Sequence, residues 1–358
     1  MGNRLIYMQY GFWRQIRNDD SVDGKRHFWD LYGALEVSNI IADIPLEEWE
    51  WKEEKEGKDN LLYYLYQNMV DGNDTEIEKY APDKIEKALD VGIKQSPKNL
   101  CATYLLGQNT MMCVGHSKQL GTLCINAGMF KSLSRESAVM YEKGEKSDSF
   151  KKCQRYMSMP CNSMIIIDPY LGMNLSNIEM NLLPILNNCL PQTTNSSGKA
   201  YSNFHLSIFT QTKNCYCGKN ESPISDKKLY DLIVNKVNSI RPDLDIDLTL
   251  FHIKTTKNGG GDFHSRHIIT NCIHVSSEDG FDLFTERNNK EVSGKHARFI
   301  FTIPTLIDNR RLDYANYCRW IKIAAENAEK SANGDYWVSE GKNKNNRLFG
   351  IVVKYEDD

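Results

Sequence analysis

The feature that most constrains this chain is an alternation of strand-like apolar runs and amphipathic helices that begins near residue 160. Met164–Ile167 is apolar and is stopped by Asp168-Pro169, which is typical of a strand buried on both faces of a sheet. Phe204–Thr210 and Ile246–Ile253 predict two further strands, with a helix in each interval. A strand, helix, strand, helix, strand order needs a sheet with helices on its faces.

The helices carry recognisable start signals. Ser176-x-x-Glu179 has the form of a capping box, and Pro184 is expected to kink that helix or delay its start. Asp226–Ile240 places its apolar residues on one helical face. The later predicted elements are the strands His267–Val275, Ala297–Ile303 and Leu348–Tyr355 and the helix Leu312–Lys330. Residues 155–358 are therefore predicted to form an α/β domain, with a mixed sheet sandwiched between helices.

A sheet of this kind binds ligands at the carboxyl ends of its strands. Asp168 and Tyr170 follow the first strand, and Thr210 ends the second. We expect these residues and the loop after Ile253 to share one rim.

Residues 1–150 are less regular and are predicted to form a mixed α+β domain. The polar stretch Tyr141–Lys152 is the best candidate for its boundary. Short helices are predicted at 61–70 and 83–91, and short strands at 100–106, 111–114 and 122–125. We expect this part of the chain to contact a protein partner.

Composition excludes several classes of protein. Hydrophobic residues make up 41% and charged residues 25%, as in folded domains, and no apolar run approaches the length of a membrane span. The ten cysteines are scattered, and Cys215-Tyr-Cys217 lacks the second pair of a zinc site. A cytoplasmic protein with free thiols, no metal and no cofactor is therefore expected. The net charge of −3 does not by itself indicate a nucleic-acid binder.

One segment carries a pattern suited to phosphate chemistry. After the three glycines that start at Gly259, His264 and Arg266 lie two residues apart, on the same face of an extended strand. An imidazole can attack phosphorus or carry a proton, while a guanidinium neutralises the non-bridging oxygens. His267 and His274 lie nearby and could form a metal cluster with His264, but polar, partly exposed histidines are the favoured interpretation.

The spacing His264-x-Arg266-x-x-x-x-Asn271 resembles the HxKx4D signature of the phospholipase D superfamily, with Arg in place of Lys and Asn in place of Asp. The similarity covers roughly residues 160–358 and is greatest to the phospholipase-D-like domains at the carboxyl end of MIT-domain proteins. It implies a degenerate phospholipase-D-like fold for the second half of the chain. Active members of the superfamily bring two His–Lys pairs to one phosphate, whereas this chain has one such motif.

Three hypotheses follow from the resemblance. The first is a non-catalytic, accessory protein that binds a phosphate-containing partner, above all nucleic acid, in a bacterial nucleic-acid-handling or antiviral defence complex. The second is a metal-independent phosphodiesterase or nuclease that works as a homodimer, and the third is a purely structural role. The candidate catalytic residues are His264, Arg266 and Asn271, and the candidate phosphate-binding residues are His264, Arg266, Asp168, Tyr170 and His205.

Overall fold

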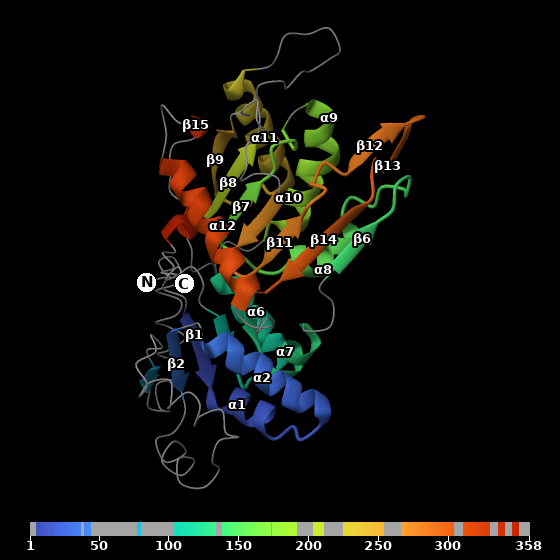
Figure 1. Ribbon diagram of the computed structural model, residues 1–358. Helices are drawn as coiled ribbons and strands as arrows, with labels where there is room; N and C mark the ends of the chain where they lie inside the picture. Colours follow the sequence, from blue (N-terminus) through green and yellow to red (C-terminus); the bar gives the residue numbers. More distant parts are fainter. Residues whose placement is uncertain are drawn as a thin grey trace.

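The computed structural model describes residues 5–36, 39–43, 77–79, 103–133, 138–172, 174–191, 203–210, 225–253, 266–303, 311–329, 336–340 and 346–350. Within these residues the strands form a five-stranded sheet, an eight-stranded sheet and a two-stranded hairpin. The two larger sheets form the lower and upper parts of Figure 1. No described helix is both long and apolar enough to cross a membrane.

The five-stranded sheet is parallel throughout and has the order β3-β2-β1-β4-β5. Its strands are β1 (Leu5–Gln9), β2 (Asn39–Asp43), β3 (Ile77–Lys79), β4 (Thr103–Leu105) and β5 (Cys124–Ile125). Its helices are α1 (Tyr10–Arg17), α2 (Val22–Glu36), α6 (Thr110–Leu120) and α7 (Ala127–Leu133). A parallel sheet with interleaved helices is an α/β arrangement, so the α+β class predicted for this part of the chain is wrong.

The helices cover both faces of this sheet. Ile6 and Met8 of β1 pack in one core with Phe12 of α1. Tyr7, which points to the other face, packs with Cys113 of α6. The predicted strand at 111–114 is wrong because it lies inside α6, whose first turn is capped by Asn109 through a hydrogen bond from the Met112 N–H.

The eight-stranded sheet is mixed and has the order β15-β9-β8-β7-β10-β11-β14-β6. Strands β7, β8 and β9 are parallel, and the other pairs are antiparallel. The strands are β6 (Ala138–Tyr141), β7 (Ser163–Ile167), β8 (Phe204–Thr210), β9 (Ile246–Ile253), β10 (Arg266–Thr270), β11 (His274–Ser277), β14 (Ala297–Thr302) and β15 (Tyr336–Glu340). The hairpin consists of β12 (Phe284–Arg287) and β13 (Lys290–Ser293). The predicted mixed α/β sheet is confirmed.

Helices cover the two faces of the mixed sheet. On one face, Met164 and Ile166 of β7 share a core with Ile185 of α10 and Ile233 of α11. On the other face, the alternate residue Ile165 packs with the α12 helix. The helices of this part are α8 (Gln154–Met157), α9 (Leu175–Asn177), α10 (Leu183–Cys189), α11 (Asp226–Ile240) and α12 (Arg311–Glu329), with shorter turns at Lys151–Cys153, Ile178–Leu182 and Arg347–Gly350. The sheet is therefore sandwiched between helices, as predicted.

The predicted helix cap and the predicted last strand differ from the structure, whereas one of the two effects expected of Pro184 is confirmed. Asn174, rather than Ser176, caps the first turn of α9, because its side chain accepts a hydrogen bond from the Asn177 N–H. Pro184 lies in the first turn of α10, so it delays the start of that helix. Part of the predicted last strand, Leu348–Tyr355, is a 3-10 turn, and residues 351–355 lie outside the described part of the chain.

The predicted boundary stretch at 141–152 belongs to the second sheet. Strand β6 pairs with β14, and Lys146 forms an isolated bridge with Val292 of β13. The sheet therefore begins near residue 138, before the predicted domain limits at 150 and 155. The predicted helices at 61–70 and 83–91 lie outside the described residues.

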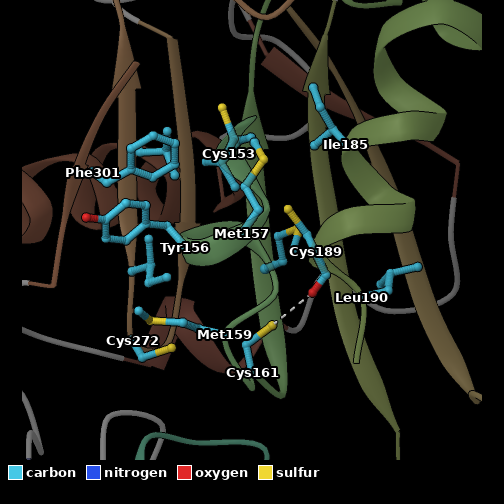
Figure 2. Close-up of a cluster of buried hydrophobic side chains, with 14 of the residues drawn as sticks. Cys153, Tyr156, Met157, Met159, Cys161, Ile185, Cys189, Leu190, Cys272 and Phe301 are labelled. Carbon is cyan, nitrogen blue, oxygen red and sulfur yellow. Dashed lines mark hydrogen bonds between the residues drawn. The ribbon is translucent and has the colours of Figure 1, made fainter. Parts of the chain in front are cut away.

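Sulfur-containing side chains fill part of the core beneath the mixed sheet. Figure 2 shows Cys153, Cys161, Cys189 and Cys272 there, near the stacked rings of Tyr156 and Phe301, whose centroids are 4.7 Å apart. All the described cysteines are free thiols, and burial raises the pKa of Cys153 to about 12. Thiols held in the protonated form are poor nucleophiles, so this cluster is part of the core packing. Cys215 and Cys217 lie outside the described residues.

Candidate functional site

The structure brings three of the predicted site residues together at the carboxyl end of β7. Asp168 follows β7, and Arg266 begins the neighbouring antiparallel strand β10. The Arg266 guanidinium carbon lies 5.1 Å from the centroid of the Tyr170 ring. Asp168 accepts hydrogen bonds from the N–H groups of Tyr170 at 2.9 Å and Phe281 at 2.7 Å. These contacts order the rim, and Thr210 joins it by accepting a hydrogen bond from the Gly172 N–H.

The electrostatics of this rim do not favour an added phosphate. Asp168 is fully buried, and burial raises its pKa to about 6, although the Phe281 N–H and the Arg266 charge oppose that rise. Arg266 donates a hydrogen bond to the Glu278 carbonyl and lies over the Tyr170 ring. The guanidinium is therefore engaged by groups of the protein itself, and a carboxylate lies beside it.

Gly280 allows the chain to close over Asp168 and Arg266. It has a φ of +86°, and a Cβ atom built there would lie 3.3 Å from Oδ2 of Asp168 and 3.4 Å from Nε of Arg266. A side chain at this position would crowd both groups and strain the backbone. Glycine at this turn is thus part of how the rim is built.

His264, the centre of the predicted constellation, lies outside the described residues. The predicted pairing of His264 with Arg266 therefore stays a prediction. The remaining predicted residues, Asn271 and His205, do not lie at this rim.

Asn271 connects the two large sheets through side-chain hydrogen bonds. It lies just beyond the far end of β10 from Arg266 and is only 1% exposed. Its Oδ1 accepts a hydrogen bond from the Asn162 N–H at 3.0 Å. Its Nδ2 donates to the Gly121 carbonyl at 3.0 Å and to Thr122 Oγ1 at 3.3 Å, in the loop between α6 and β5. A five-residue strand separates Asn271 from the rim, and its Nδ2 connects the two sheets. Its predicted catalytic role stays a prediction.

His205 lies at the opposite end of the sheet. It is near the start of β8 and pairs with Ser163, whereas Asp168 follows the other end of β7. Its Nδ1 accepts a hydrogen bond from the Arg347 N–H at 3.1 Å. Burial, with help from the Arg347 charge, lowers its pKa to about 4, so the ring is neutral. His205 therefore lies away from Asp168, and its predicted phosphate-binding role stays a prediction.

A pocket of about 480 Å³ lies on the face of the eight-stranded sheet that α12 covers, between α12 and strands β10, β11 and β14. Ligand sites commonly have volumes of roughly 300–1,000 Å³. The residues that line this pocket are His267, His274, Ser276, Ser277, Glu278, Asp279, Arg298, Ile300, Thr302, Asn316, Arg319 and Trp320.

Two buried histidines form part of the pocket wall. Nδ1 of His267 lies 2.9 Å from Nε2 of His274, and the His267 ring packs 3.9 Å from the ring of Trp320, measured between centroids. Burial lowers the pKa of both imidazoles, to about 4 for His274, so both are neutral near pH 7. His267 Nε2 is buried and, in the described ranges of the chain, has no hydrogen-bond partner. The expectation that these histidines are partly exposed is wrong.

The sequence contained a signal for this pair. The register pairs Ile269 with His274 and His267 with Ser276. In an antiparallel pair, opposed residues lie on the same face, as do residues two apart on one strand. His267 lies two residues before Ile269, and Ile269 lies opposite His274. Both histidine rings are therefore on one face of the sheet. Among the described residues, no three His, Cys, Asp or Glu side chains are grouped so that they could hold a metal ion.

Two arginines reach the same pocket from different elements. Arg298 lies on β14 and Arg319 on α12, and both side chains are exposed. The acidic side chains of the lining, Glu278 and Asp279, directly follow β11. The walls of the pocket thus combine two guanidinium groups and two carboxylates with aromatic rings and neutral polar groups.

Fold and site together define a mixed α/β protein with a pocket between a helix and a sheet. No family model matches the chain, and no curated protein matches it. Among solved structures, the chain is similar to TrmBL2, an archaeal chromatin protein described as showing a novel mode of DNA binding. The identity is 13%, the match covers 55% of this chain and 57% of that chain, and the TM-score is 0.23. At this TM-score the likeness carries no conclusion about site or activity.

Proposed function

We propose that this protein binds a phosphate-containing partner, namely single-stranded nucleic acid, in the pocket between α12 and strands β10, β11 and β14. The observation that carries the proposal is the pair Arg298 and Arg319, which line one pocket from opposite walls. Arginine binds phosphate oxygens through paired, parallel hydrogen bonds. Proteins that bind single strands combine such cations with aromatic side chains, and Trp320 also lines this pocket.

The neutral polar groups of the pocket support the same class of ligand. His267 and His274 are neutral, and Ser276, Thr302 and Asn316 add groups that can donate or accept hydrogen bonds. Groups of this kind can pair with the edge of a base, while the two arginines hold the backbone. The pocket volume of about 480 Å³ is in the range of small-ligand sites and suits one nucleotide rather than a duplex.

We also propose that residues 160–358 are a degenerate phospholipase-D-like unit that binds without hydrolysis. Two observations support this part of the proposal. Arg266 is engaged by the Glu278 carbonyl and lies near the Asp168 carboxyl group. Asn271, at the acidic position of the motif, fastens the two sheets. A bacterial nucleic-acid-handling or antiviral complex is the setting that such an accessory protein would suit.

The test is to mix the purified full chain with a fluorescently labelled single-stranded oligonucleotide, then measure both anisotropy and strand length. We expect binding that weakens steeply as salt is raised, with the strand intact on a denaturing gel. Absence of binding at low salt would overturn the proposal. Cleavage that resists chelators and disappears in His264→Ala would instead establish the phosphodiesterase hypothesis.

A further inference from the structure

The N-terminal sheet has a change of direction at its centre. Its strand order β3-β2-β1-β4-β5 places β1 beside β4, and the chain builds outward on both sides of that pair. Helix α1, which follows β1, packs on one face, and α6, which follows β4, packs on the other. In open parallel sheets this is the point where ligands bind, at the carboxyl ends of the strands.

A buried carboxylate lies beside this point. Asp43 ends β2, pairs in register with Gln9 of β1, and is 3% exposed. Its Oδ2 accepts a hydrogen bond of 2.6 Å from the Tyr7 hydroxyl. Its Oδ1 is buried and has no hydrogen-bond partner within the described part of the chain. A buried acceptor without a donor is costly, so this oxygen is suited to a donor that the described residues do not supply.

The side chains around Asp43 hold it in place. The Gly107 N–H donates to Gln9 Oε1 at 2.9 Å, and Gln9 lies beside Asp43 in the register of β1 and β2. This chain of contacts runs across the ends of β4, β1 and β2. Burial raises the pKa of Asp43, while the hydrogen bond from Tyr7 favours its ionised form. The carboxylate is therefore oriented in advance, with one oxygen left for another partner.

The starts of two helices meet at the same place. Helix α1 follows β1 directly, with Gln9 at its N-cap, no side-chain cap and no acidic residue in its first turn. Gly11 and Gly107 are so close that a Cβ at Gly107 would lie 2.9 Å from the Gly11 Cα. The first N–H groups of a helix bind anions when no side chain caps them. Gln108, which follows Gly107, adds a buried side-chain oxygen that has no hydrogen-bond partner among the residues that the structure describes.

We propose that the carboxyl ends of β1, β2 and β4 bind a ribonucleotide, with its phosphate at the start of α1 and its ribose hydroxyls at Asp43. A ribose phosphate supplies both groups that the site lacks, namely hydroxyl donors for Asp43 and an anion for the uncapped helix. The site is separate from the pocket beside α12, since it lies on the other sheet and shares no residue with it.

The test uses the four common ribonucleoside diphosphates and their 2′-deoxy counterparts, titrated into the full chain by calorimetry. We expect at least one ribonucleotide to bind and its 2′-deoxy form to bind about tenfold more weakly, because a hydrogen bond to the Asp43 carboxylate is lost. This comparison needs no variant. Failure of all four to bind at millimolar concentration, or equal affinity of the ribo and deoxy forms, would overturn the proposal.

A variant pair tests the same contact from the protein side. Asp43→Asn should weaken ribonucleotide binding by about tenfold or more and abolish the preference over the deoxy form. Asp148→Asn is the matched control, because Asp148 also accepts a hydrogen bond from a tyrosine hydroxyl, that of Tyr141, beside the other sheet. The control should bind as the unaltered protein does. Unchanged affinity in a folded Asp43→Asn variant would contradict the proposal.

Discussion

In the pocket beside α12, Nδ1 of His267 and Nε2 of His274 lie 2.9 Å apart, so the two imidazoles share one hydrogen bond. Each ring is neutral, because burial lowers both pKa values. A neutral imidazole has one donor nitrogen and one acceptor nitrogen. His267 Nε2 is therefore an acceptor if Nδ1 donates in the shared bond, and a donor if Nδ1 accepts. The pair therefore offers a ligand a neutral polar atom, and the positive charge comes from Arg298 and Arg319.

The histidine pair makes stability depend on pH. An unfolded imidazole takes up a proton near pH 6.5, whereas the folded pKa of His274 is about 4. The folded state thus binds fewer protons between these values, so its stability falls as pH falls below about 6.5. Between pH 7 and pH 5 each such imidazole should lower the free energy of unfolding by about 2 kcal/mol.

Urea unfolding of the unaltered protein and His274→Gln at both pH values measures this effect. The buried Asp168 carboxyl group, with its pKa raised to about 6, acts in the opposite direction in both proteins and cancels in the comparison. The variant should show a shallower fall in stability. His296→Gln, at an exposed position, is the control for loss of a histidine. Identical pH profiles for all three proteins would show that His274 titrates as in the unfolded chain.

Replacing Asn271 should weaken the connection between the two sheets. Asn271→Ala removes three hydrogen bonds and leaves the Asn162 N–H buried without its partner, so we expect a loss of about 2–4 kcal/mol. Asn271→Asp restores the acid of the phospholipase D motif, but it cannot donate to the Gly121 carbonyl and should also destabilise the protein. Asn238→Ala, on the exposed side of α11, is the control. A stable Asn271→Asp variant that gained phosphodiesterase activity would contradict the fastening role.

Two glycines separate backbone strain from crowding at the rim. Gly144 and Gly280 have nearly equal φ values of +85° and +86°, but a Cβ at Gly144 would meet nothing within 4 Å. Gly144→Ala should therefore cost about 1 kcal/mol for the backbone alone. Gly280→Ala should cost about 1–3 kcal/mol more, because its Cβ would press on Asp282 and Asp168. Equal losses in thermal or urea unfolding would mean that the turn can move away from Asp168.

Arg266 is expected to act on stability rather than on ligand binding. Arg266→Ala leaves the buried Asp168 carboxylate without its neighbouring cation, so the pKa of Asp168 rises further and the ionised form costs more. The loss of melting temperature should then be greater at pH 8 than at pH 5, while oligonucleotide affinity changes less than about twofold. A large loss of oligonucleotide affinity with unchanged stability would mean that Arg266 contacts the ligand.

The parts of the fold that local pattern decides could be predicted. Phe204–Thr210, Asp226–Ile240 and Ile246–Ile253 have the predicted bounds, because continuous apolar runs and a 3.6-residue periodicity leave little alternative there. The short apolar run at 111–114 is ambiguous and favours a strand, whereas the cap at Asn109 decides for a helix. The parallel order of the N-terminal sheet depends on contacts between distant strands that no single segment encodes.

The sequence predicts only part of the candidate site, because local pattern does not show which distant residues meet. Asp168, Tyr170 and Arg266 meet because adjacent strands end at one edge, which the order of the elements implies. Motif spacing alone places Asn271 with them, and only the register shows that Asn271 and His205 lie at the other ends of their strands. The arginines of the pocket, Arg298 and Arg319, come from β14 and α12, and nothing in the sequence joins them.

The most direct test of the proposed function is the salt dependence of oligonucleotide binding in Arg298→Ala/Arg319→Ala. Arg287→Ala/Lys290→Ala, which removes two cations from the β12–β13 hairpin, is the control of equal charge. Loss of two phosphate contacts should lower the slope of log affinity against log salt by about 1.4 and weaken binding at least tenfold at low salt. If both double variants bind with the affinity and slope of the unaltered protein, the pocket is not the nucleic-acid site.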